Sequence, residues 1–251
     1  MTDIILSGCS GKMGQSIINC VSQRDDCRIS AGVDINEPSG CSFEFSKNFS
    51  GLEGAADVII DFSNPVVLDS MLSYAVEKKL PCVICTTGYS EEQKAKIIEA
   101  SKKIPVFYSG NMSLGINLII ELAKKAASVF GEDFDIEIVE QHHNQKLDAP
   151  SGTALMIADA VSQVRTDSEY VYDRHAYRRK RGKNEIGIHS VRGGNIVGEH
   201  EIIFAGTDEV LTISHSARSK TVFAVGAVNA AVFLKGKEPG MYDMSHLLAS
   251  K

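Results

Sequence analysis

The sequence predicts an α/β fold in two domains: a Rossmann-like doubly wound parallel sheet, and a second α+β domain with a mixed sheet. In the first half of the chain, short β-branched runs alternate with helical patterns, which is the element order of a parallel sheet covered by helices on both faces. A glycine-rich loop joins the first of these strands to the first helix. After Asn111 the pattern changes to one long helix and then to strands separated by Gly and Asp. This change is typical of a second domain built on a mixed or antiparallel sheet.

The first domain contains five apolar runs with the length and composition of buried strands: residues 3–7, 28–34, 58–62, 81–85 and 104–108. Three helical patterns lie between them: residues 14–23, 66–77 and 90–101. The last helix begins at Ser90 and has Gln93 three residues later, which is the spacing of a capping box. Because strand and helix alternate with short connections, neighbouring strands are expected to run parallel.

The second domain begins with a helical pattern at residues 114–130. Four strand-like stretches follow it: residues 134–140, 185–192, 195–205 and 209–215. An apolar helix at residues 221–234 is expected to return to the first domain. The predicted boundaries are therefore 1–113 together with 221–251 for the first domain, and 114–220 for the second.

The composition is that of an ordinary soluble globular protein, with 43% hydrophobic and 23% charged residues in a chain of 251. The net charge of −6 gives no overall attraction to nucleic acid or to an anionic membrane, so neither is expected as a partner. The basic run between residues 174 and 183 is better explained as a solvated loop, or as a positive rim for an anionic substrate, than as a nucleic-acid site. Since no segment resembles a signal peptide or reaches the length of a membrane span, we expect a cytoplasmic protein.

All six cysteines lie in the first third of the chain: Cys9, Cys20, Cys27, Cys41, Cys82 and Cys85. Such placement, without a secretion signal, predicts reduced thiols and not a disulfide framework. Cys82 and Cys85 have the C-x-x-C spacing, but the sequence offers no second pair or nearby histidine for zinc. The apolar residues between them have the character of a buried strand. Neither a metal site nor a redox role is therefore expected there.

The loop at residues 8–14 carries three glycines with the spacing G-x-x-G-x-x-G: Gly8, Gly11 and Gly14. Glycines at these positions permit a tight turn and a close approach of the backbone to a pyrophosphate at the N-terminus of the following helix. The alternative is a merely structural turn. However, Asp34 ends the next strand about twenty residues later, where an acid that binds ribose is expected. The sequence therefore predicts a nicotinamide dinucleotide cofactor.

Asp34 favours NADH over NADPH, because a carboxylate accepts hydrogen bonds from ribose hydroxyls and repels a 2′-phosphate. Lys12 could reach such a phosphate, so the use of both cofactors stays open. Two further loops, at residues 61–65 and 85–88, follow predicted strands and would lie at the ligand-binding edge of an open α/β sheet. Ordinary turn chemistry is the alternative explanation for each loop.

The segment 140–153 combines two adjacent imidazoles, His142 and His143, with the ammonium of Lys146 and a helix start that contains Ser151. A helix start of this kind offers free backbone N–H groups and a partial positive charge to an anion. The alternative is a pair of structural histidines. A zinc site is disfavoured, because adjacent residues on a strand point to opposite faces and the H-E-x-x-H pattern is absent from the sequence. The segment therefore indicates a site for an acidic small molecule, with a proton donor beside it.

These residues closely resemble the 4-hydroxy-tetrahydrodipicolinate reductase family, long called dihydrodipicolinate reductases, of the diaminopimelate route to lysine. The resemblance extends through residues 8–14, 61–65, 86–88, 111–113, 140–153, 190–194 and 198–200. Segment 140–153 is highly specific to that family. The resemblance implies an oxidoreductase that uses NADH or NADPH without a metal and takes a cyclic dicarboxylate as substrate. It also implies that residues 114–220 bind the substrate and assemble a homotetramer.

The resemblance implies roles for individual residues as well. Hydride would pass from C4 of the nicotinamide to the substrate ring, His142 would donate the proton, and Lys146 would be a second acid–base group and a carboxylate anchor. The substrate would be bound by His143, Lys146, Gly152 and Thr153. The cofactor would be bound by Gly8, Cys9, Ser10, Gly11, Lys12, Met13, Asp34, Cys85, Thr86, Thr87, Ser109, Gly110, Asn111 and Met112.

The chain departs from the commonest family pattern at three positions: Lys12 and Lys220 stand where Arg is frequent, and Cys85 stands where Gly is usual. Lys12 offers a point charge instead of a bidentate fork, which weakens any preference for NADPH. Cys85 is expected to add a small apolar side chain near the nicotinamide pocket.

Two other functions remain alternatives: a non-catalytic NAD(H)-binding regulator, and a different amino-acid dehydrogenase, such as one that acts on aspartate. The set of His142, His143 and Lys146 argues against a regulator, which has no use for a proton donor. A different dehydrogenase would share the glycine loop but would not need segment 140–153.

Overall fold

The computed structural model describes residues 1–176 and 178–250, and the chain divides into two units. Unit 1 consists of Met1–Leu114 and Lys220–Lys251, and unit 2 of Gly115–Ser219. These boundaries differ by one residue from those expected from the sequence, after residues 113 and 220.

Unit 1 is built on a seven-stranded parallel sheet with the order β12-β6-β5-β4-β1-β2-β3. Its strands are β1 (Thr2–Ser7), β2 (Cys27–Val33), β3 (Glu44–Ser46), β4 (Val58–Asp61), β5 (Cys82–Ile84), β6 (Pro105–Tyr108) and β12 (Gly240–Tyr242). The chain starts in the middle of the sheet, moves to one side through β2 and β3, and then crosses to the other side. The strand order therefore reverses between β1 and β4, and ligands of open α/β sheets bind at such a point.

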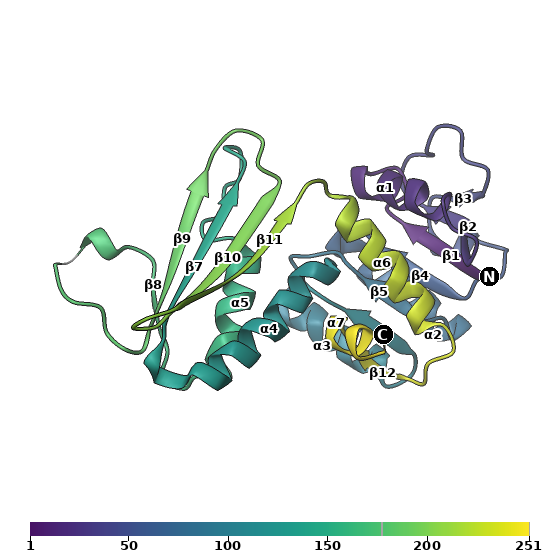
Figure 1. Cartoon of the computed structure of the whole chain (residues 1–251). Helices are drawn as coiled ribbons and strands as arrows, with labels where there is room; N and C mark the ends of the chain where they lie inside the picture. The colour runs from purple at the N-terminus through teal and green to yellow at the C-terminus, as the bar shows by residue number, and fades with distance from the viewer. Residues whose placement is uncertain (177, 251) are drawn as a thin grey trace. The chain divides into compact units, whose positions relative to one another are not determined.

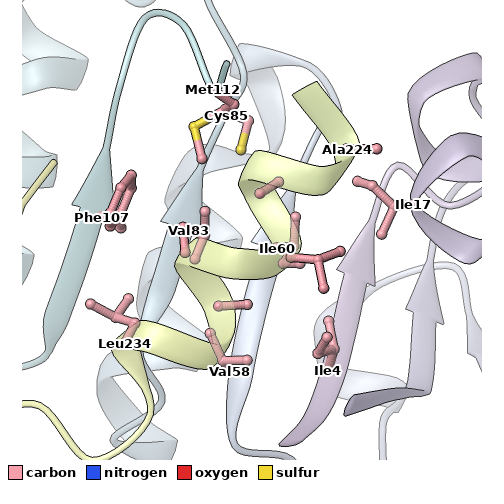
Figure 2. Packing of buried hydrophobic residues seen from close by; sticks show 14 of the residues in the cluster. Ile4, Ile17, Val58, Ile60, Val83, Cys85, Phe107, Met112, Ala224 and Leu234 are labelled. Carbon is pink, nitrogen blue, oxygen red and sulfur yellow. The ribbon is translucent and has the colours of Figure 1, made fainter. Parts of the chain in front are cut away.

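Helices cover both faces of this sheet because alternate residues of each strand point to opposite sides. Ile4 and Ile60 pack with α1 (Lys12–Val21), α6 (Thr221–Leu234) and α7 (Met244–Ala249), as the close view in Figure 2 shows for α6. Ile5 and Ile59 pack with α2 (Leu68–Lys78) and α3 (Glu91–Ser101) on the other face. The doubly wound architecture predicted from the sequence is confirmed.

Helix α6 returns to unit 1 from the far end of the chain and lies beside α1 and across β4 and β5 (Figure 1). Its residues are almost all apolar, and seven of them are buried. Gly226 allows the close approach, since a Cβ at this position would lie 1.7 Å from the carbonyl oxygen of Met112. The helix and the loop after β6 therefore pack backbone against backbone.

Unit 2 contains a mixed five-stranded sheet with the order β11-β10-β7-β9-β8. Its strands are β7 (Asp135–His142), β8 (Glu169–Val171), β9 (Glu185–Arg192), β10 (Gly198–Ala205) and β11 (Val210–Ala217). β7 and β9 run parallel, whereas β10 is antiparallel to both β7 and β11. α4 (Leu114–Phe130) and α5 (Gly152–Ser162) pack on the face that carries Ile138, Ile188 and Ile202. The polar residues at the end of β7 lie on this same helix-covered face.

Several local predictions hold. Ser90 caps α3 with a capping box that includes Gln93, and the predicted limits of α4, β9 and α6 coincide with the observed ones. The helix expected at 66–77 instead begins as a 3₁₀ turn, η2 (Pro65–Val67), which Asn64 caps. Further 3₁₀ turns are η1 (Phe49–Gly51), η3 (Gly131–Asp133) and η4 (Arg174–Ala176). The sequence did not predict β3, β8, β12 or α7, each of which is very short. Among the residues described, every helix is too short or too polar to cross a membrane.

Replacing Gly226 should destabilise the protein, because the added methyl group of Gly226→Ala meets a backbone atom that cannot rotate away. Overpacking of this kind typically costs about 1–3 kcal/mol, and we expect roughly 3 kcal/mol here. Urea unfolding at pH 7 measures the effect. Val225→Ala on the more exposed side of the same helix is the control and should change the midpoint much less. Equal midpoints for the two variants would contradict the close packing of α6.

Candidate active site

The glycine loop between β1 and α1 is folded so tightly that side chains are excluded at Gly8 and Gly14. Gly8 has φ = +83°, and a Cβ there would lie 2.3 Å from the carbonyl oxygen of Phe62. A Cβ at Gly14 would lie 2.2 Å from the carbonyl oxygen of Gly8. Gly11 is the N-cap of α1 and makes no side-chain capping bond, so the first backbone N–H groups of α1 stay available to a ligand. The loop thus has the form that a pyrophosphate group requires.

Asp34 follows β2 directly, and its carboxylate accepts hydrogen bonds from the backbone N–H of Ser10 (2.9 Å) and of Ile35 (2.7 Å). It lines a cavity of about 520 Å³. This cavity also takes in the glycine loop, the loop after β4, and Lys47. The sequence had given no role to Lys47; it follows Ser46, whose carbonyl accepts the N–H of Asp34 at 3.3 Å. An anionic and a cationic side chain therefore border the same cavity at the switch point of the sheet.

The loops after β4 and β5 are bonded to each other. The backbone N–H of Ser63 donates to Oγ1 of buried Thr86 at 2.9 Å, and the hydroxyl of Tyr89 donates to Asp61 at 3.3 Å. Thr87 next to Thr86 is exposed. The loop after β6 is closed by its own contacts, in which Oγ of Ser109 donates to the carbonyl of Asn111 at 2.9 Å. The predicted cofactor residues of unit 1 thus lie at the carboxyl ends of β1, β2, β5 and β6.

Three of these residues point their side chains into the core. Cys9, Cys85 and Met112 belong to the cluster beneath α6, and Figure 2 shows Cys85 and Met112 close together there. Burial, followed by the charge of Asp34, raises the pKa of the Cys9 thiol to about 11, and burial also raises the pKa of Cys85. The Cys85 side chain, which was expected to lie near the nicotinamide pocket, packs among the apolar residues beneath α6. Any contact of these residues with a nucleotide would have to come from their backbone.

In unit 2, the end of β7 carries a buried carboxylate with several hydrogen-bond donors around it. Glu140 is fully buried, and its Oε2 lies 2.6 Å from Nδ1 of His142. Arg192 on β9 donates to both carboxylate oxygens, at 2.8 Å and 2.7 Å. The backbone N–H of Ser151 donates to Oε1 at 3.1 Å. Burial alone would raise the pKa of Glu140, but the hydrogen bonds from Arg192, Ser190 and His142 outweigh it and lower the pKa to about 2. Glu140 is therefore an anion at neutral pH.

Helix α5 begins beside this carboxylate. Ser151 is its N-cap, with the side chain accepting from the N–H of Ala154 at 3.2 Å, as expected from the sequence. The hydroxyl of Ser151 also lies 3.1 Å from Nε2 of buried His200 on β10. Gly152 is exposed, and the space that its Cβ would occupy is open. The start of α5, which includes Thr153, is thus accessible to an anion.

The loop between β7 and α5 carries the remaining predicted residues. The N–H of Lys146 donates to the carbonyl of His143 at 3.1 Å, and the Lys146 ammonium lies 2.9 Å from Asp148. This ion pair lowers the pKa of Asp148. Burial lowers the pKa of His200, and the charges that His142 and Lys146 can carry lower it further. Unit 2 therefore gathers His142, His143, Lys146, Gly152 and Thr153 at one strand end, one loop and one helix start.

Sequence reasoning missed the partners of these residues. Glu140, Arg192 and His200 belonged to motifs that carry the family resemblance, but no role was given to them. One available signal was strand alternation, which places Glu140 and His142 on the same face of β7. The pairing of Glu140 with Arg192 joins residues far apart in sequence and leaves no local pattern.

The basic run was expected to be a solvated loop or a substrate rim, and this is wrong for part of it. Arg181 is only 17% exposed in its side chain and forms ion pairs with Asp135 (2.8 Å) and Glu137 (3.0 Å). Arg174 pairs with Glu185 at 2.8 Å. These arginines hold their own loop against β7 and β9. Within residues 1–176 and 178–250, no three His, Cys, Asp or Glu side chains gather as a metal site would require.

Two family models match the chain: "dihydrodipicolinate reductase, N-terminus" over residues 2–112, and "dihydrodipicolinate reductase, C-terminus" over residues 115–248. The chain is 51% identical over 251 residues to the 4-hydroxy-tetrahydrodipicolinate reductase of Clostridium tetani, covering 100% of this chain and 98% of the relative. It is also 51% identical over 249 residues to that of Caldanaerobacter subterraneus, covering 99% and 98%. Among solved structures it is similar to the dipicolinate-bound dihydrodipicolinate reductase from a Paenisporosarcina species, with a TM-score of 0.80, 26% identity and 97% of each chain covered.

The stability of the protein should fall in mild acid because of His200. Burial, and then the charge of His142, lowers its pKa from 6.5 to about 4 in the folded protein. The unfolded chain binds this proton near pH 6.5. Between pH 6.5 and 4 the unfolded chain therefore holds more protons than the folded chain, and the free energy of unfolding decreases as the pH is lowered. The loss from this one residue can reach roughly 3 kcal/mol, and it is absent above pH 6.5.

Urea unfolding of the wild type and of His200→Gln at pH 7 and pH 4.5 tests this expectation. The variant cannot take up the proton, so its loss of stability between the two pH values should be clearly smaller. Because all other titrating groups are common to both proteins, an equal loss would show that His200 does not carry the effect.

Proposed function

The chain belongs to the dihydrodipicolinate reductase family, and from this premise we propose how its residues reduce 4-hydroxy-tetrahydrodipicolinate to tetrahydrodipicolinate. The protein is an oxidoreductase of the diaminopimelate route to lysine. One observation carries the proposal beyond family membership: unit 2 places a histidine, a lysine and an open helix start together around a buried carboxylate. This arrangement can bind a dicarboxylate and donate a proton to the anion that hydride addition creates on its ring.

We assign the cofactor to unit 1. The fit rests on the tight turn at Gly8 and Gly14, the open start of α1, and the cavity beside Asp34. The N–H groups of Lys12 and Met13 at the start of α1 would hold the pyrophosphate, and the loops after β5 and β6 would hold the nicotinamide end. When bound, reduced nicotinamide supplies the hydride from C4. The exposed side chain of Thr87 and the backbone of Cys85 are the groups that the β5 loop offers to it.

We further propose that NADH is preferred over NADPH. The carboxylate of Asp34 is bonded to two backbone N–H groups, and neither of those bonds cancels its charge. It can accept from ribose hydroxyls and repels a 2′-phosphate. Lys12 and Lys47 supply positive charge near the same cavity, so NADPH remains usable. The balance between the charge of Asp34 and the charges of these lysines sets the ratio of the catalytic efficiencies with NADH and with NADPH.

The substrate is a doubly charged ring, and its two carboxylates need separate positive groups. The N–H groups of Gly152 and Thr153 at the start of α5 suit one carboxylate. The ammonium of Lys146, with His143 beside it, suits the other. Asp148, which pairs with Lys146, would have to yield that contact when the substrate binds. Because the net charge of the chain is −6, such local groups are needed to hold a dianion.

We assign the proton to His142, with Lys146 as a second acid–base group. Hydride addition leaves an enamine-like anion on the substrate, which must gain a proton to become product. The ring of His142 is held at Nδ1 by Glu140, so its other nitrogen, Nε2, is the one that can serve a ligand.

The assembly that we propose is a homotetramer in the cytoplasm, formed through unit 2. The sheet of unit 2 presents Val191 (44% exposed) and Val210 (63% exposed) on the face opposite α4 and α5, and a second copy of the chain would cover them. A reducing compartment suits a chain whose six cysteines are free.

The variant His142→Gln tests the central assignment. A positioned acid contributes ~10²–10⁴-fold, so kcat should fall by about that factor while the dissociation constant of NADH stays unchanged. The assay follows NADH oxidation with the product of dihydrodipicolinate synthase as substrate. The control, His189→Gln, removes a second histidine of the unit 2 sheet that pairs with a carboxylate, and it should keep most of the activity.

The same assay separates the alternatives. A regulator would bind NADH but oxidise none of it, and an aspartate dehydrogenase would be indifferent to the synthase product. An unchanged kcat in His142→Gln would remove this residue from the mechanism.

The variant Lys47→Ala tests the cofactor assignment. If Lys47 attracts a 2′-phosphate, its removal should raise KM for NADPH about tenfold, equivalent to about 1.4 kcal/mol, and leave KM for NADH within about twofold. The matched control is Lys103→Ala, an exposed lysine outside this cavity. Equal changes for both cofactors would show that Lys47 does not distinguish them.

A further inference from the structure

We propose that Glu140 and Arg192 form a positioning device that fixes the ring of His142 with a proton on Nδ1, so that Nε2 delivers the second proton to the substrate. This inference rests on the proposed role of His142 as proton donor. It adds two residues that act through His142 and make no contact with the reacting atoms.

The geometry leaves the carboxylate of Glu140 little freedom. Its Oε2 bonds to His142 at 2.6 Å and to Arg192 at 2.8 Å, while Oε1 bonds to Arg192 at 2.7 Å and to the N–H of Ser151 at 3.1 Å. Arg192 also donates to the carbonyl of Asp148 at 2.6 Å, so the guanidinium is itself held in place. The carboxylate that holds the ring of His142 is therefore well anchored.

These bonds determine which nitrogen of His142 carries the proton. An ionised carboxylate can only accept hydrogen bonds, so the nitrogen that faces Glu140 must be a donor. Although burial alone would raise it, the hydrogen bonds from Arg192, Ser190 and His142 lower the pKa of Glu140, so the carboxylate is ionised at neutral pH. In the neutral ring the proton is thus on Nδ1, and Nε2 is free to take up and release the second proton. This is the orienting role that an aspartate plays beside the histidine of serine proteases.

The same carboxylate connects the proton donor to the substrate-binding helix. Because Oε1 accepts from the N–H of Ser151, the start of α5 is fixed relative to His142. On the other side of the ring, a Cβ at Gly198 would lie 3.0 Å from Nε2. The absence of a side chain at this position leaves Nε2 uncrowded, as a nitrogen that must meet a ligand requires.

The proton step then balances without a further reactant. In the imidazolium form, the Nε2–H bond breaks and its electron pair stays on nitrogen, while a C–H bond forms at the carbanion-like carbon that hydride addition has created. The ring is left neutral with its proton on Nδ1, which is the form that Glu140 stabilises. Water can then restore the proton on Nε2.

The chain contains its own matched control on the opposite face of the same two strands. Glu137 on β7 bonds to Nε2 of His189 on β9 at 2.7 Å and to Arg181 at 3.0 Å. This second set also consists of a glutamate, a histidine and an arginine, but it lies outside the group of residues assigned to the substrate. If the role of Glu140 were purely structural, replacing Glu140 and replacing Glu137 should lower kcat by similar factors.

The experiment compares Glu140→Gln with Glu137→Gln, at the same oligomeric state by gel filtration. A glutamine has one acceptor oxygen for Arg192, Ser151 and His142, so its NH₂ group should face the ring and shift the His142 proton to Nε2. We expect kcat of Glu140→Gln to fall at least about 100-fold, with NADH affinity retained, and Glu137→Gln to stay within about threefold of the wild type. In Glu140→Gln/His142→Gln, the loss should not exceed that of His142→Gln alone.

A spectroscopic measurement on the wild type decides the matter even if Glu140→Gln fails to fold. ¹⁵N NMR of histidine-labelled enzyme, with the His142 signals assigned by their loss in His142→Gln, should show the neutral ring protonated on Nδ1. A proton on Nε2, or a kcat in Glu140→Gln close to that of Glu137→Gln, would overturn the inference. If His142→Gln itself keeps its activity, the proposed function fails instead, so the two failures are distinguishable.

Discussion

The buried carboxylate of Glu140 is the constraint on which the arrangement of unit 2 depends. An unpaired charge in such a place would be costly, and it is stable here because Arg192 and the N–H of Ser151 surround it with donors. Burial also makes each of these bonds stronger than it would be in water. One side chain on the central strand β7 thereby joins β9, the start of α5 and the ring of His142. A buried ion pair is weak evidence for stability in general, but it specifies one geometry, which is what a catalytic site needs.

Positive groups are concentrated at the two places where an anionic ligand is proposed to bind. The chain is acidic overall, so an anionic ligand must be attracted by local groups acting against the average field. In both units these groups are backbone N–H groups at a helix start, with lysines beside them: Lys12 and Lys47 near α1, and Lys146 before α5. The partial positive charge of a helix start is fixed in position by the backbone, whereas a lysine side chain can rotate away from the ligand. Specificity thus rests mainly on the backbone, which is the part of the site that the fold itself positions.

The sequence predicted the features that local patterns encode, and it failed where contacts join distant residues. The glycine loop, the capping box at Ser90 and the apolar helix α6 leave signals within a few residues. The strands β3, β8 and β12 have three residues each, too few to show a period, and only their neighbours in the sheet define them. The pairing of Glu140 with Arg192 and the position of Lys47 depend on the tertiary fold. The direction of the Cys85 thiol was also beyond the sequence, because packing against Met112 and α6 decides it.

Two glutamate–histidine pairs on the same strands show how alternation assigns different tasks to similar residues. The contacts are nearly equal in length, 2.6 Å for Glu140 with His142 and 2.7 Å for Glu137 with His189. Their surroundings differ, because Glu140 is fully buried on the helix-covered face whereas the Glu137 side chain is 22% exposed on the other. The buried pair lies beside the positive end of α5, and the exposed one is screened by solvent and serves to hold a loop through Arg181. Since successive residues of a strand point to opposite faces, a slip of one residue in β7 would exchange the two environments. The register of this strand, set by the isoleucines that pack under α4 and α5, therefore keeps Glu140 and His142 on the face that carries the start of α5.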